Sequence, residues 1–86
     1  MLGRVLVTLK REVLDPQGDA VARGLAALDL SGVRGVRVGK VIEVSLDPGL
    51  DRDAALALLN AAADGFLANP VLETWSVELV DEAASP

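Results

Sequence analysis

The chain lacks histidine, cysteine and tyrosine altogether, and its aromatic residues are one tryptophan and one phenylalanine. Histidine and cysteine are the side chains that most often act as general bases or nucleophiles near neutral pH. Their absence leaves carboxylates, lysine, serine and threonine for any chemistry, and no pairing of these is apparent. We therefore assign no catalytic and no cofactor-binding residues to this chain.

The same absences remove the usual means of stabilising a small domain. A single domain of 86 residues buries only roughly 60 to 65% of the surface that its unfolded chain exposes. Without cysteine there is no disulfide framework, and without a His/Cys cluster we assign no metal ligands. Association with other chains is the remaining source of stability, so we expect an oligomer or a subunit.

Positive charge is missing from the C-terminal part of the chain, from residue 53 onward. The formal net charge is −5, and all the basic residues lie within the first 52 positions, while residues 53–86 carry only acids. A net negative charge argues against nucleic acid as a partner. The two halves therefore present surfaces of different charge to a partner protein.

Long apolar runs are also absent. No stretch approaches the roughly 18 apolar residues that a membrane-spanning helix needs. The apolar stretch from Met1 to Leu9 is too short for a secretory signal and is interrupted by Arg4. We expect a cytoplasmic protein with no membrane partner.

Alternating apolar and polar residues predict four strands, at about residues 2–10, 36–38, 42–46 and 74–79. The middle two form a predicted hairpin with a three-residue loop over 39–41. That loop length sets Val38 opposite Ile42 and Val36 opposite Val44, which keeps the apolar side chains on one face.

Two helices are predicted between the strands. The first begins after Asp15-Pro16, an N-cap carboxylate followed by proline at the first helical position, and runs to about Leu28. The second covers about residues 52–67, with Asp51 as its N-cap, and Asn69-Pro70 stops it. The residues expected to face the core are Val21, Leu25 and Leu28 in the first helix, and Leu56, Leu59, Ala63 and Phe66 in the second.

This β-α-β-β-α-β order predicts an α+β fold of the ferredoxin-like kind. It is a two-layer sandwich in which two helices cover one face of a four-stranded antiparallel sheet. We expect one domain over residues 1–80 and a polar C-terminal tail over residues 81–86.

The second helix carries few polar residues, namely Arg52, Asp53, Asn60 and Asp64. A helix that is apolar nearly all round is usually buried on more than its core side, which favours a contact with another chain. Alanine is also the best helix former and tolerates solvent, so the composition has a simpler explanation. The sequence leaves both explanations open.

Two motifs with chemical associations fail on spacing. The run from Gly35 to Lys40 has three residues between its glycines, where a phosphate-binding loop has four, and Val41 replaces the serine or threonine that would hold magnesium. Asp47, Asp51 and Asp53 lack the alternating oxygen ligands of a calcium loop. Turn and capping roles account for these residues.

Three segments resemble one known family. They are Val13–Gly18 after the first strand, Val36–Glu43 at the predicted hairpin, and Leu67–Glu73 before the last strand. In this order and spacing they are similar to PurS, the small subunit of phosphoribosylformylglycinamidine (FGAM) synthase, over residues 2–80.

The resemblance implies a non-catalytic accessory subunit of a C-N ligase in de novo purine biosynthesis. That enzyme uses ATP and the amide of glutamine to convert formylglycinamide ribonucleotide to FGAM. The implied partners are a second copy of the chain in a dimer or tetramer, the large synthetase subunit PurL, which is expected to hold ATP and magnesium, and the glutaminase subunit PurQ. We predict that the partner contacts are Arg37, Gly39 and Lys40 at the hairpin tip and Asn69 and Pro70 at the later turn.

An alternative remains open from the fold alone. A ferredoxin-like regulatory module binds a small effector at a dimer interface and needs no larger subunit. Binding of an amino acid or nucleotide to the isolated chain would distinguish it from an assembly subunit.

Overall fold

A computed structural model describes residues 1–80 of the chain. Its elements are β1 (Leu2–Leu9), α1 (Pro16–Ala27), β2 (Gly39–Ser45), α2 (Arg52–Ala62), a π-helical turn η1 (Ala63–Leu67) and β3 (Glu73–Val80). The predicted polar tail, residues 81–86, lies outside the described residues.

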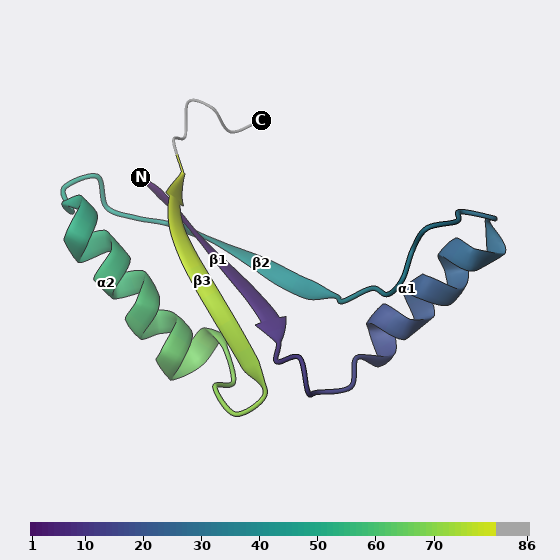
Figure 1. The fold of residues 1–86 in the computed structure, drawn as a ribbon. Helices are drawn as coiled ribbons and strands as arrows, with labels where there is room; N and C mark the ends of the chain where they lie inside the picture. Colours follow the sequence, from purple (N-terminus) through teal and green to yellow (C-terminus); the bar gives the residue numbers. More distant parts are fainter. Residues whose placement is uncertain (81–86) are drawn as a thin grey trace.

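The three strands form one antiparallel sheet in the order β2-β1-β3 (Figure 1). In this register Val5 of the central strand lies opposite Ile42 of β2 and Val77 of β3. Because β1 has a neighbour on each side and a helix over one face, Val5 and Val7 are completely or almost completely buried.

The prediction of a four-stranded sheet is wrong, because residues 36–38 form no strand and no hairpin. Gly39, placed in the hairpin loop by the sequence, instead begins β2 opposite Thr8. The apolar residues Val36, Val38, Ile42, Val44 and Leu46 all have even numbers and stay in phase. One continuous extended segment therefore produces the same alternation as a hairpin with a three-residue loop.

Helix α2 covers the face of the sheet on which Val5 and Val7 lie. Asp51 is its N-cap, and the carboxylate accepts a hydrogen bond from the Ala54 N–H at 2.7 Å, as predicted. Leu59 of α2 is completely buried. The buried core consists of Val5, Val7, Leu46, Ala55, Leu59, Ala63 and Ala68.

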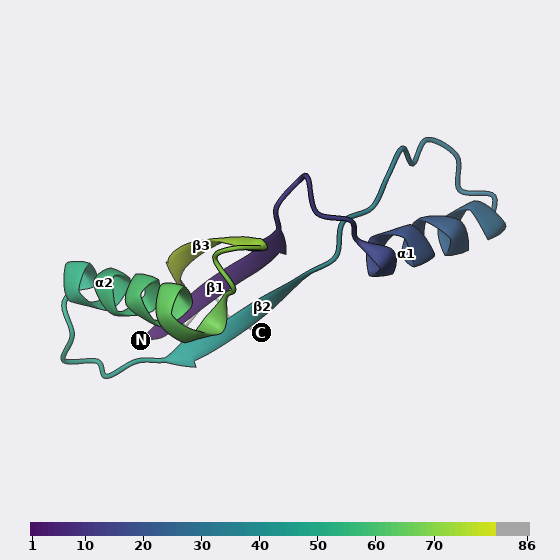
Figure 2. The same cartoon turned by 90° about the horizontal axis from the view of Figure 1, so that it is seen from below.

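Helix α1 projects beyond the sheet instead of lying on it (Figures 1 and 2). The prediction that two helices share one face is therefore wrong for this chain. Of the residues expected to face the core, Val21 is 44% and Leu28 is 70% exposed. The radius of gyration is 16.1 Å, whereas a compact domain of this length has a radius of about 12 Å.

The end of the second helix also differs from the prediction. The Ala68 N–H donates to the Ala63 carbonyl at 2.9 Å, a five-residue spacing that makes the turn wider than an α-helical one. The extra residue gives Leu67 the partly buried position, and Phe66 is 88% exposed. Phe66, predicted to face the core, therefore lies on the surface.

Candidate interaction surfaces

The segment from residue 10 to residue 38, with α1 at its centre, is called the arm below. Asp15 fixes its base, because this carboxylate caps α1 by accepting from the Gly18 N–H at 2.8 Å and also accepts from the Val38 N–H at 2.7 Å. One side chain thus joins both ends of the arm. The predicted N-cap is confirmed, and its second bond, to Val38, was not foreseen.

The hydrogen bonds that Asp15 accepts change its acidity. Those from Val38 and then Gly18 stabilise the ionised form and hold the pKa of Asp15 below its ordinary value, although burial acts in the opposite direction. Asp15 is therefore ionised at neutral pH and accepts bonds that a protonated carboxyl would weaken.

Gly18 allows the two ends of the arm to approach closely. A Cβ atom added at this position would lie 2.1 Å from the Val36 carbonyl oxygen, far inside van der Waals contact. The first turn of α1 can therefore rest against the segment before β2 only because residue 18 has no side chain.

Arg37 completes the base of the arm. Its Nη2 donates to the Lys10 carbonyl at 2.8 Å and to the Val13 carbonyl at 2.9 Å. The guanidinium, predicted as a partner contact, thus has a role within the chain. Its contact with a partner stays a prediction.

Outside its base, the arm exposes several large apolar side chains. Gly18 is the only buried residue of α1. Five large apolar side chains of the arm are exposed: Leu14, Val21, Leu28, Leu30 and Val33. An exposed apolar surface of this kind is typical of a contact with another protein.

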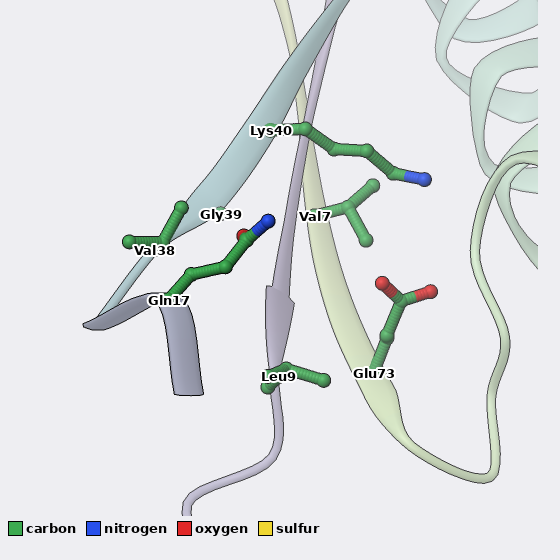
Figure 3. Close-up of a pocket in the computed structure, with 7 residues that line it drawn as sticks. All are labelled: Val7, Leu9, Gln17, Val38, Gly39, Lys40 and Glu73. Atoms are coloured by element: carbon green, nitrogen blue, oxygen red, sulfur yellow. The ribbon is translucent and has the colours of Figure 1, made fainter. Parts of the chain in front are cut away.

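A groove of about 220 Å³ lies beside the arm base, where β1 ends and β2 and β3 begin (Figure 3). Its apolar lining comes from Val7, Leu9 and Val38. Gln17, Lys40 and Glu73 add polar groups, and Gly39 completes the lining. Figure 3 shows the Lys40 and Glu73 side chains extending over the same side of the sheet.

The structure gives Gly39 a different role from the predicted one. A Cβ atom at Gly39 would lie 2.6 Å from the Val7 carbonyl oxygen, so the glycine permits close pairing of β1 and β2 and does not form a hairpin tip. Gly39 and Lys40 do lie together, in the groove. Their contact with a partner stays a prediction.

Asn69 and Pro70 lie in the turn before β3, and Asn69 holds that turn in place. Its N–H donates to Glu73 Oε1 at 2.7 Å, and its own Oδ1 accepts from the Val71 N–H at 3.0 Å. Its carbonyl accepts from the N–H groups of Leu72 and Glu73. Because Glu73 also lines the groove, the two predicted contact regions meet at this residue.

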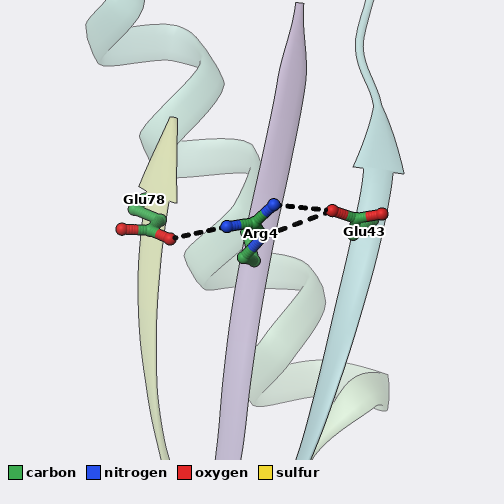
Figure 4. Close-up of polar contacts among 3 residues, drawn as sticks. All are labelled: Arg4, Glu43 and Glu78. Carbon is green, nitrogen blue, oxygen red and sulfur yellow. Dashed lines mark hydrogen bonds and ion pairs between the residues drawn. The ribbon is translucent and has the colours of Figure 1, made fainter. Parts of the chain in front are cut away.

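The face of the sheet away from α2 carries a cluster of charged side chains. Arg4 of β1 pairs with Glu43 of β2 at 2.8 Å and with Glu78 of β3 at 3.6 Å (Figure 4). The hydrogen bond from Arg4 to Glu43 is the main cause that raises the pKa of Arg4. The three side chains connect all three strands, and their exposure makes their contribution to stability modest.

Within residues 1–80, no group of three acidic, histidine or cysteine side chains could hold a metal ion. In the same part of the chain, no helix has the length and hydropathy required to span a membrane.

Comparison with known proteins agrees with these observations. Residues 3–81 match the family model described as PurS, phosphoribosylformylglycinamidine (FGAM) synthase. The phosphoribosylformylglycinamidine synthase subunit PurS of Mycobacterium leprae is 42% identical over 73 residues, which are 85% of this chain and 87% of that protein.

Two solved structures are similar in fold as well. Thermus thermophilus PurS is 34% identical with a TM-score of 0.73, covering 93% of this chain and 96% of that one. A chain in the structure of PurLQS from Thermotoga maritima is 28% identical with a TM-score of 0.71, covering 91% and 96%. The resemblance inferred from three short segments is confirmed, and the chain belongs to the PurS family of phosphoribosylformylglycinamidine synthase subunits.

Proposed function

We propose that this chain is the non-catalytic assembly subunit of FGAM synthase. The observation that carries the proposal is its similarity, over nearly its whole length, to a chain of the PurLQS structure. In that reading a large synthetase subunit, PurL, and a glutaminase subunit, PurQ, are the partners. ATP and magnesium belong to PurL, and the complex works in the cytoplasm.

The composition of the chain supports a role in assembly. It has no histidine or cysteine, and residues 1–80 contain no candidate metal cluster. A protein of this kind contributes to catalysis by placing two active sites close together, so that ammonia released at one reaches the other before it escapes to water.

Self-association is the second part of the proposal. The apolar stripe of α1, formed by Val21, Leu25 and Leu28, is largely exposed in the described part of the chain, with Val21 44% and Leu28 70% exposed. The groove beside the arm base offers apolar residues and lies uncovered. A twofold arrangement in which each arm lies in the groove of the other copy would bury both surfaces.

The proposal is tested by reconstitution from purified subunits. Glutamine-dependent formation of FGAM is measured with PurL and PurQ, with and without this chain. We expect product only when the chain is present. Equal rates in its absence would refute the assigned function.

Ammonia transfer can be tested separately by replacing glutamine with ammonium chloride. If the chain serves mainly to transfer ammonia, a high concentration of free ammonia should largely remove the requirement for it. A requirement that is as strong with ammonium chloride would indicate that the chain is needed by the synthetase itself.

A further inference from the structure

The two oxygens of the Asp15 carboxylate bind different ends of the arm. Oδ1 accepts from the Gly18 N–H at 2.8 Å and caps α1, whereas Oδ2 accepts from the Val38 N–H at 2.7 Å, directly before β2. Asp15 is only 5% exposed, so water competes little for either oxygen. One carboxylate therefore both starts the helix and ties it to the strand that follows.

Arg37 joins the base of the arm from the other side. Its guanidinium donates to the Lys10 and Val13 carbonyls at 2.8 and 2.9 Å, on the segment that leaves β1. Asp15 and Arg37, called the clasp below, together hold the chain that enters the arm against the chain that leaves it. The clasp thus continues the association of β1 and β2 beyond the last residue pair of their ladder. Helix α1 points away from the sheet as a result (Figure 1).

Packing does little to fix the direction of the arm. Gly18 is the only buried residue of α1. Helix α2 packs against β1 and β3, but α1 has no comparable contact with any strand within residues 1–80. The direction of the arm therefore depends on a few polar bonds at its base.

Without the clasp, α1 would be able to pack on the sheet of its own chain. Ile42 and Val44 of β2 are only partly buried, and they lie on the face that α2 occupies. A segment of the same chain competes for them at an effective concentration in about the millimolar range, roughly a thousandfold above a second copy at micromolar concentration. An arm that pivots freely would therefore fold back. Two helices would then share one face of the sheet, as the sequence alone predicts.

We propose that Asp15 and Arg37 act as a clasp that holds α1 away from its own sheet, and so keep the apolar stripe of the arm available to a second copy. This inference rests on the proposed function, since it takes self-association from it. It adds the two residues that decide whether the stripe is used within one chain or between two.

The test compares a double variant, Asp15→Asn/Arg37→Ala, with a matched control, Asp19→Asn/Arg34→Ala. Asparagine keeps an oxygen for the helix cap, but its amide NH2 group cannot accept the hydrogen bond from the Val38 N–H. The control makes the same chemical changes at two exposed arm residues whose side chains form no hydrogen bond or ion pair within residues 1–80. The two proteins therefore differ only in the clasp.

Spin labels measure the direction of the arm. They are placed at Arg23→Cys in α1 and Ser45→Cys at the end of β2, both exposed positions, and labelling is specific because the chain has no cysteine. Dilution into an excess of unlabelled protein restricts the signal to pairs within one chain. Because β2 runs from the arm base to Ser45, a folded-back α1 would approach this residue. In the double variant the distance between the labels should fall by about 15 Å or more, close to the length of the helix.

Light scattering over a range of concentrations measures self-association. In the double variant only a fraction of the molecules would have a projecting arm, so the dissociation constant of the oligomer should rise by about tenfold or more. The control should match the unaltered chain in both measurements.

Each outcome decides a different point. An unchanged label distance in the double variant, or an equal change in the control, would refute the inference. A shorter distance with unchanged self-association would also refute it, because the stripe would then not be the contact. If the unaltered chain is a monomer, the proposed self-association fails, while the label distance still decides whether the clasp directs the arm. Circular dichroism verifies that α1 is retained, and Arg37→Ala alone, which leaves the cap intact, is measured in the same way should the double variant lose helix.

Discussion

At the scale of single residues, the base of the arm depends on atoms that a sequence pattern does not reveal. Asp15 is readable as an N-cap because Pro16 follows it, and the structure confirms that local role. Its bond to Val38 joins positions 23 residues apart and follows only from the path of the chain. The requirement for glycine at position 18 also follows from the path of the chain, because the nearest neighbour of Gly18 is the Val36 carbonyl.

Gly18→Ala should displace the first turn of α1 from the segment before β2, because the new methyl group would overlap the Val36 carbonyl. Circular dichroism and urea unfolding should show a loss of helix and stability. Gly24→Ala is the matched control on the same helix, where nothing lies within 4 Å. It should stabilise the chain by about 0.5 to 1 kcal/mol through helix propensity. Equal losses in both variants would contradict this account.

Asp15 should contribute to the pH dependence of stability. Because its folded pKa is lowered, its contribution is fully present above its unfolded pKa of about 4 and is lost as the pH falls through the folded value. Urea unfolding between pH 7 and pH 2 should therefore show a smaller acid-induced loss in Asp15→Asn than in the unaltered chain. Identical pH profiles would show that the carboxylate contributes nothing.

At the scale of elements, the helices and strands that carry a clear local signal in the sequence are predicted correctly. The caps at Asp15 and Asp51 and the alternation in β1 and β3 were sufficient for those elements. The prediction failed where two structures share one pattern. Val36 to Leu46 fits a hairpin and a single extended segment equally well, and only pairing with β1 distinguishes them.

The prediction that Phe66 faces the core failed for a related reason. In a regular α-helix, Leu59, Ala63 and Phe66 share a face. One additional residue in the last turn changes which side chain points inward. No sequence pattern in Ala63–Leu67 predicted that wider turn.

The two leucines at the middle of α2 test how the helix is attached to the sheet. Leu59→Ala should lower the free energy of unfolding by about 2 to 5 kcal/mol, because Leu59 is completely buried. Leu58→Ala, at a side chain that is 43% exposed, should lower it by less than about 1 kcal/mol. Urea denaturation measures both, and similar values would mean that α2 lies differently on the sheet.

At the scale of the whole molecule, the sequence does not show which apolar surfaces a second chain covers. The apolar stripe on α1 was predicted to face the core, because an apolar face has the same sequence pattern whether its own sheet or another copy covers it. The length of the molecule, 49 Å along its longest axis, follows from this unpaired arm.

Leu28→Asp should prevent self-association, because it places a charge within the stripe of α1. Ala26→Asp introduces the same charge on the opposite side of that helix and should leave the oligomer intact. Sedimentation or light scattering measures both masses. A monomeric Ala26→Asp, or an oligomeric Leu28→Asp, would show that the stripe is not the contact.

The projecting arm has a thermodynamic consequence. When two molecules complete each other's apolar contacts, folding and encounter are parts of one equilibrium, and dilution favours the unfolded chain by mass action. The melting temperature should therefore rise with the amount of protein in the sample. A cell that makes too little of this subunit would lose it by unfolding as well as by scarcity.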